Sequence, residues 1–135
     1  MLFQYIPVVR SGSSCRFPFV NLQVFNTNNG RYKDVFALVD SGSEVSVFRT
    51  DVAENLGLDL HNGRKVIFGG FGSGEIPGVL VTVDMQLWLD NTPHRWNAEV
   101  IFSDAAKERQ VLGQEGFFDK FEVIFRRKSA EFEIR

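Results

Sequence analysis

The chain of 135 residues carries 15 Lys and Arg against 17 Asp and Glu, and this formal net charge of −2 excludes a broad basic surface for nucleic acid. Hydrophobic residues make up 44% and charged residues 24%, as in an ordinary globular protein, and the length predicts a single domain over residues 1–135. Apolar runs such as 35–39 are far shorter than the ~20 residues that a membrane helix needs, so we expect no membrane partner.

The first third of the chain has the pattern of β-strands joined by polar turns. Residues 17–25 give the first strong strand pattern, and the Asn- and Gly-rich stretch 26–30 predicts a hairpin loop, because these residues tolerate positive φ. The next strand, 32–39, ends in a nearly continuous apolar run, which indicates burial on both faces. A polar turn over 40–43 follows directly, and residues 45–48 resume an apolar strand.

The middle of the chain holds the clearest helix and the longest strand. Residues 51–57 predict a short helix, with Asp51 as its cap and Gly57 as its left-handed stop. Residues 65–68 lead into the glycine-rich loop 69–74. From 79 to 89 hydrophobic side chains occupy every second position, which predicts one long strand.

The last third predicts a partner strand over 96–102, a short helix over 114–118 and two closing strands over 121–125 and 131–134. Aromatic residues are abundant, with 14 Phe, and glycines are scattered in a way that is typical of β-structure. We therefore expect a mostly β fold, a small closed barrel-like domain with one or two short helices.

One carboxylate stands out for its position. Asp40 directly follows the buried strand, in a turn where Ser41 and Gly42 offer a hydroxyl and backbone N–H groups that can hold it. From the tripeptide alone, an aspartate that merely ends a strand is the simpler explanation.

The surrounding sequence resembles that of retroviral-type aspartic proteases (retropepsins). Residues 37–48 resemble the family's catalytic segment, in which an apolar strand leads into Asp-Thr/Ser-Gly-Ala-Asp. The loop over 67–74 resembles the family's flap, a glycine-rich hairpin with an apolar residue at its tip. Residues 111–115 resemble the apolar-apolar-Gly-Arg-Asp/Asn motif that begins a late helix. The three motifs occur in the family's order and span about 17–125, and they imply the acid-protease fold with one lobe per chain.

The resemblance implies a role for each motif residue. Asp40 would be the catalytic carboxylate, the Ser41 hydroxyl would form hydrogen bonds across the active-site floor, and Gly42 would let backbone and substrate approach. Glu44 stands where the family has an Asp that contacts the substrate backbone. The flap residues expected to bind substrate are Gly69, Gly70, Phe71 and Gly72.

The chain departs from the family pattern at four positions. Ser41 replaces the commoner Thr, Ser43 replaces Ala, and Glu44 replaces Asp. Gln114 replaces the Arg of the late motif, which removes any ion pair that this Arg would make.

The implied chemistry needs two carboxylates that share one proton. Asp-Ser-Gly occurs once, and no other Asp is followed by Thr-Gly or Ser-Gly, so one chain carries half a site and a homodimer is expected. The predicted function is an aspartic endopeptidase that acts on an extended peptide or protein substrate. The alternative is a non-catalytic module of the same fold that binds peptide or dimerises.

Other chemistries have weaker support. His61 or His94 could in principle serve Ser41 or Ser43 as a base, but the chain lacks a Gly-x-Ser-x-Gly elbow. The histidines and Cys15 do not have metal-ligand spacing, and the glycine-rich loop matches no phosphate-binding motif, so we expect no metal and no cofactor. A single cysteine and a start without a signal-peptide pattern predict a cytoplasmic protein.

Overall fold

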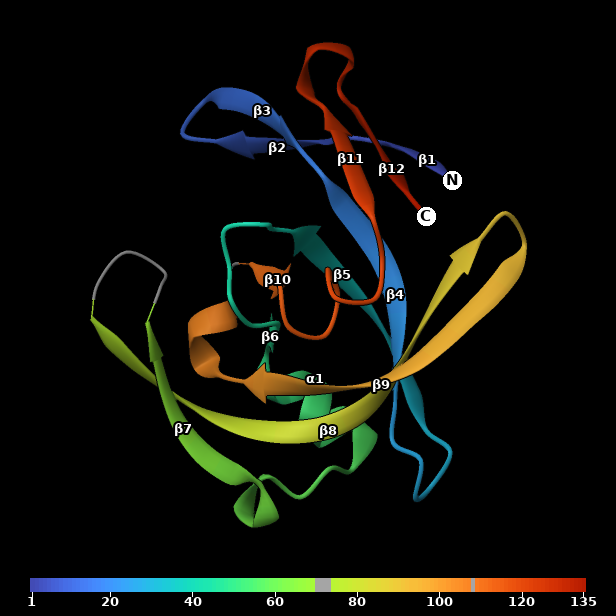
Figure 1. Cartoon of the computed structure of the whole chain (residues 1–135). Helices are drawn as coiled ribbons and strands as arrows, with labels where there is room; N and C mark the ends of the chain where they lie inside the picture. Colours follow the sequence, from blue (N-terminus) through green and yellow to red (C-terminus); the bar gives the residue numbers. More distant parts are fainter. Residues whose placement is uncertain (70–73, 108) are drawn as a thin grey trace.

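The computed structural model describes residues 1–69, 74–107 and 109–135, and it is mostly β-structure (Figure 1). Helix α1 (Thr50–Leu56) is accompanied by three short 3-10 turns, and no helix in these ranges is long and apolar enough to cross a membrane. The strands are β1 (Leu2–Gln4), β2 (Ile6–Arg10), β3 (Ser13–Phe17), β4 (Phe19–Phe25), β5 (Tyr32–Val39), β6 (Val47–Phe48), β7 (Arg64–Gly69), β8 (Glu75–Leu89), β9 (Thr92–Phe102), β10 (Gln110–Leu112), β11 (Val123–Arg126) and β12 (Glu131–Ile134).

The main sheet closes into a ring. Its strand order is β4-β5-β10-β6-β9-β8-β7, and β4 also pairs with β8, so that β7 alone extends beyond the ring. Most neighbours are antiparallel, whereas β5 with β10 and β6 with β9 are parallel. A smaller sheet joins both ends of the chain in the order β1-β12-β11, and β2 pairs with β3 in a separate ribbon. The predicted mostly β, barrel-like fold is confirmed.

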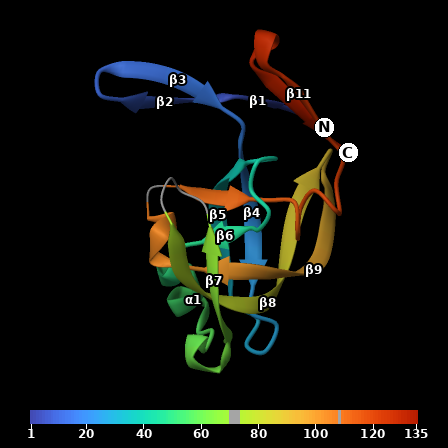
Figure 2. The same ribbon diagram turned by 60° about the vertical axis from the view of Figure 1, so that its left-hand side comes forward.

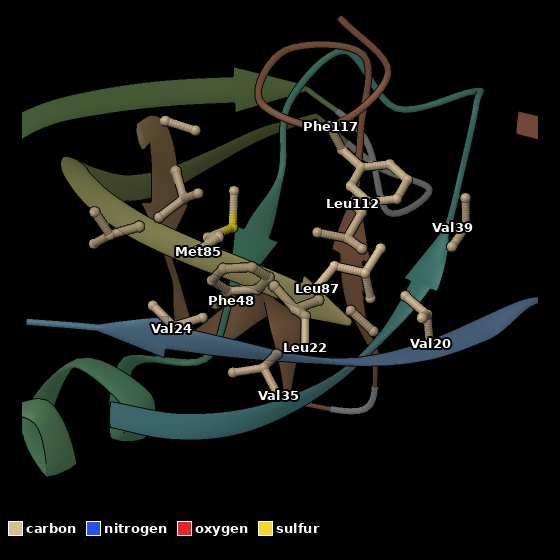
Figure 3. Packing of buried hydrophobic residues seen from close by; sticks show 14 of the residues in the cluster. Val20, Leu22, Val24, Val35, Val39, Phe48, Met85, Leu87, Leu112 and Phe117 are labelled. Carbon is tan, nitrogen blue, oxygen red and sulfur yellow. The ribbon is translucent and has the colours of Figure 1, made fainter. Parts of the chain in front are cut away.

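The core fills the inside of the ring because the strands alternate apolar and polar residues. Every second residue in this part of β8 is buried, as the alternating sequence predicts: Val83, Met85, Leu87 and Leu89. They pack with side chains from β4, β5 and β10, and Figure 3 shows these residues converging from facing strands. The labelled core residues are Val20, Leu22, Val24, Val35, Val39, Phe48, Met85, Leu87, Leu112 and Phe117.

The helix predicted over 51–57 is present as α1, but the prediction that Asp51 caps it is wrong. α1 has Arg49 as its N-cap residue, with no side-chain cap hydrogen bond. Asp51 lies in the first turn instead, where its carboxylate accepts a hydrogen bond from Arg49 Nε at 3.1 Å. Gly57 does end the helix, with a left-handed φ of 70°.

The predicted helix over 114–118 is wrong, because this segment forms turns. Gly116 has a φ of +91°, which no right-handed helix permits, and its N–H is held by the Asp119 carboxylate at 3.3 Å. The segment is a compact loop after β10, and this loop lies against the turn that carries Asp40, as described below.

Candidate active site

Asp40 lies where the buried strand β5 ends. β5 is paired on one side with β4 and on the other with β10, and the Asp40 N–H donates to the Leu112 carbonyl oxygen at 3.0 Å. The chain then turns, because the Ser43 N–H donates back to the Asp40 carbonyl oxygen at 3.1 Å. The Asp40 side chain is half-buried, so its carboxylate is fixed by the sheet yet open to a reactant.

Gly42 allows the backbone to come close to this carboxylate. Its N–H donates to Asp40 Oδ1 at 3.0 Å, and a Cβ at position 42 would lie 3.3 Å from the same oxygen. Such a separation is tighter than ordinary van der Waals contact, so a larger residue here would push the turn away. The exposed Ser41 occupies the position between them.

The loop after β10 runs alongside the turn and holds it. The Gln114 N–H donates to the Ser43 carbonyl oxygen at 2.8 Å, and the Glu115 N–H donates to that of Glu44 at 2.9 Å. Gln114 adds a side-chain hydrogen bond, from Nε2 to the Ser41 carbonyl oxygen at 2.7 Å. Gln114 stands where the retropepsin pattern has Arg, and here its amide binds the Asp40 turn directly.

Two further residues bring the segments together, and the sequence analysis did not identify either as part of the site. A Cβ at Gly113 would overlap the Val45 carbonyl oxygen and lie 2.7 Å from that of Ser43, so only glycine fits this approach. The buried Ser46 hydroxyl accepts from the Gly113 N–H at 3.0 Å and donates to the Glu115 carbonyl oxygen at 3.2 Å. In the sequence, Ser46 could have been singled out because it is the one hydroxyl residue within the apolar segment 45–48.

Asp40 faces a cleft of about 790 Å³. Of the residues predicted for the site, Asp40, Gly42, Glu44 and Gly69 line this cleft, whereas Ser41 does not. Gly70, Phe71 and Gly72 lie outside the described residues. The apolar wall is formed by Val45, Val66, Ile67, Phe68, Leu80, Ile101 and Val111.

One side of the cleft is a hairpin made by β7 and the first part of β8. The two strands are paired from Arg64↔Leu80 to Gly69↔Glu75. In Figures 1 and 2 this hairpin rises beside the main sheet, toward the same end of the molecule at which β5 finishes. The arrangement places Gly69 opposite the turn that holds Asp40, across the cleft that both residues line.

The polar part of the cleft is dominated by carboxylates. Glu44, Glu99 and Glu115 line it together with Asp40, and Arg64 and Arg109 are the cations among the described lining residues. Arg109 lies over the ring of Phe17, 5.1 Å from its centroid.

The alternative bases for Ser41 or Ser43 are not at the cleft. His61 belongs to the 3-10 turn Leu60–Asn62, and His94 packs edge-on against Phe121, with ring centroids 6.3 Å apart. Neither histidine is among the described lining residues. Within the described ranges no group of three His, Cys, Asp or Glu side chains could hold a metal ion.

The comparisons with known proteins agree with this geometry. The family model described as "Aspartyl protease" matches residues 22–115, a stretch that contains the Asp40 turn and ends in the loop after β10. A crystal structure of a retropepsin-like aspartic protease from Rickettsia conorii is similar over 99% of this chain and 88% of that chain, with a TM-score of 0.64 and 15% sequence identity. The EIAV protease complexed with the inhibitor HBY-793 matches 77% of this chain and 88% of its own, with a TM-score of 0.47 and 17% identity. No curated protein matches the chain. The fold is retropepsin-like, as the sequence predicted.

Proposed function

This chain belongs to the aspartyl protease family, and we propose that it is an aspartic endopeptidase whose catalytic pair consists of Asp40 from each of two identical subunits. The observation that carries the proposal is the placement of Asp40. It ends a strand that is paired on both sides, it accepts a hydrogen bond from the Gly42 N–H, and it faces an open cleft. Each chain contributes one lobe.

The second carboxylate comes from the partner because the chain has a single Asp-Ser-Gly turn. Among the described lining residues of the cleft, Asp40 is the one aspartate. A two-fold symmetric dimer brings two copies of the same turn together, and such dimers are the commonest oligomers. The exposed Ser41 hydroxyl then lies at the junction, where it can form a hydrogen bond across the floor of the site.

The reaction follows from a pair of carboxylates that shares one proton. The ionised Asp40 removes a proton from a water molecule as the water oxygen attacks the scissile carbonyl carbon. The protonated Asp40 of the other subunit donates to the carbonyl oxygen, and a tetrahedral diol forms. The amide nitrogen then takes the proton that came from the water, the other carboxylate takes back a proton from a diol hydroxyl, and the C–N bond breaks. A carboxylic acid and an amine leave, and the pair is again singly protonated.

The substrate is an extended peptide that lies between the Asp40 turn and the β7–β8 hairpin. Strand-like binding satisfies the backbone of such a peptide with main-chain hydrogen bonds, while side chains enter pockets. Glu44 lines the cleft and is proposed to accept from a substrate N–H. The resemblance to retropepsins assigns the flap role to Gly69, Gly70, Phe71 and Gly72, of which the last three lie outside the described residues.

Digestion of a diverse peptide mixture, followed by mass spectrometry over a range of pH, tests this proposal. We expect new peptide termini with the wild-type protein and none with Asp40→Asn, because Asn keeps the shape of the side chain but cannot share the proton. Asp34→Asn is the matched control, since Asp34 is an exposed aspartate on the same strand. Cleavage by a folded Asp40→Asn variant would refute the mechanism, and a wild-type protein that binds peptides without cleaving them would make the chain a non-catalytic module.

A further inference from the structure

The ribbon β2–β3 pairs with no other strand in the part of the chain that the structure describes. Its two strands pair only with each other, from Ile6↔Phe17 to Arg10↔Ser13. A two-stranded ribbon that stands alone is marginally stable in water, and this one exposes two aliphatic side chains, Val9 at 74% and Ile6 at 36%. Such a ribbon is expected to gain stability from a surface that covers it.

The base of the ribbon is anchored to the terminal sheet. Arg127, in the turn between β11 and β12, donates to the Arg16 carbonyl oxygen at 2.5 Å and to Cys15 Sγ at 3.6 Å. The tip is a tight turn with positive φ at both Ser11 (46°) and Gly12 (79°), which matches the right-handed twist of the strands. The ribbon is therefore a regular, preformed element and not an irregular tail.

The ribbon starts beside the catalytic turn. The Val39 N–H donates to the Pro18 carbonyl oxygen at 2.9 Å, and Phe19 lies opposite Leu38, so the end of β3 adjoins the end of β5. In Figures 1 and 2 the ribbon lies beyond the end of the main sheet where β5 finishes, above the ring in both views.

The position of the ribbon beside the Asp40 turn indicates that the second subunit covers it. The proposed function, on which this inference rests, requires two Asp40 carboxylates close enough to share a proton, so the two-fold axis must pass beside Asp40. A strand of five residues is about 17 Å long. A ribbon of this length that starts beside the Asp40 turn is long enough to reach the other subunit across this axis.

We propose that the β2–β3 ribbon is a dimerisation arm that packs on the partner subunit and buries Val9 there. The arm stabilises the dimer, and through it the catalytic pair, without contacting the scissile bond.

Sedimentation velocity over a dilution series tests the arm with Val9→Asp. An exposed Val can be replaced by Asp at little cost in a monomer, whereas a carboxylate buried at an interface is expensive, so we expect the dimer dissociation constant to rise at least ~10-fold. Val9→Thr retains the shape and β-propensity and should stay near the wild type. Tyr32→Asp is the matched control, since Tyr32 is 58% exposed at the opposite end of β5 and should leave the dimer unchanged.

The result separates the arm from the proposed chemistry because sedimentation needs no substrate. A dimer that Val9→Asp weakens supports the arm even if no peptide is cleaved. A Val9→Asp dimer as tight as the wild type, or one with only a raised KM, would overturn the proposal and make the ribbon a free or substrate-binding element. If Val9→Asp does not fold, Ser14→Glu decides, because the exposed Ser14 lies opposite Val9 on the same face of the ribbon: it should also raise the dimer dissociation constant, and an unchanged constant would overturn the proposal.

Discussion

The side-chain amide of Gln114 donates a 2.7 Å hydrogen bond to the carbonyl oxygen of Ser41, a residue 73 positions earlier that lies next to Asp40. The loop after β10 therefore holds the Asp40 turn by a side-chain contact as well as by its backbone. In Gln114→Glu a carboxylate faces the Ser41 carbonyl oxygen and the donor is lost. A hydrogen bond contributes about 1 kcal/mol, so we expect kcat/KM to fall roughly fivefold and Tm to fall by about 3 °C.

Gln86→Glu is the matched control for this variant. Gln86 Nε2 donates to Gln23 Oε1 at 2.9 Å on the strands β8 and β4, outside the cleft. Enzyme kinetics and thermal unfolding should be measured for both variants, and we expect a loss of kcat/KM in Gln114→Glu but not in Gln86→Glu. An activity loss of equal size in the two variants would mean that Gln114 has no specific role at the turn.

The sequence predicted the parts of the fold that local patterns determine. Period-two alternation identified β8, the Asn- and Gly-rich loop identified the turn between β4 and β5, and Gly57 identified the end of α1. The position of Asp40 after a buried strand was also readable, because an apolar run that stops at a polar turn marks the end of a strand.

The parts that depend on distant contacts were missed. The segment 114–118 forms turns and not the predicted helix, because Gly113 packs against Val45 and Gly116 adopts a positive φ. Neither constraint can be recognised from the local sequence. Asp51 does not cap α1 because the helix begins at Thr50, which places Asp51 within its first turn. The strands β1 and β2 and nearly all of β3 precede the first segment that the sequence predicted, since strands of three to five residues without regular alternation carry a weak pattern.

Gly113→Ala should destabilise the protein strongly. The added methyl group would overlap the backbone of Val45 and Ser43, and backbone cannot rotate away as a side chain can. We expect a loss of about 3 kcal/mol and a Tm lower by roughly 10 °C. Gly69→Ala is the control for stability, because a Cβ at that position meets nothing within 4 Å. Equal melting temperatures for the two variants would contradict the close packing at Gly113.

Subunit mixing should expose the shared nature of the site. If each subunit supplies one Asp40, wild-type chains that pair with excess Asp40→Asn chains form hybrids that lack one carboxylate. We expect the activity to fall toward the small fraction of wild-type pairs, and the specific activity of the wild type alone to fall on dilution. Asp34→Asn chains mixed in the same excess should leave the activity intact. Activity that simply follows the amount of wild-type chain would indicate a site complete within one chain.

Glu133, in the terminal sheet, is a carboxylate with a clearly shifted pKa. The pKa of Glu133 lies below its ordinary value of 4.5, chiefly because the Arg135 side chain donates a hydrogen bond to the carboxylate. The positive charges of Arg135, Arg126 and the N-terminal amine lower this pKa further, whereas desolvation opposes the shift. A lowered pKa in the folded state stabilises the protein above pH 4.5, and this contribution is lost as the pH falls further. Glu133→Gln should therefore lower Tm slightly at neutral pH and reduce its dependence on pH below 4.5. Glu131→Gln, on the same strand, is the control, and a pH dependence of Tm unchanged in Glu133→Gln would refute the assignment.

The pH dependence of catalysis should follow the shared proton. Only the singly protonated Asp40 pair contains both a base for the water and an acid for the scissile carbonyl, so activity should rise and then fall as the pH increases. On the acid side the second carboxylate becomes protonated and no base remains; on the alkaline side the shared proton leaves and no acid remains. The profile of kcat/KM should therefore be bell-shaped, and both limbs should appear at pH values where circular dichroism shows a folded protein. Gln114→Glu places a further carboxylate beside the turn, and this negative charge favours the protonated pair, so both limbs should move to higher pH. A rate that keeps rising through alkaline pH would mean that a group other than the Asp40 pair activates the water.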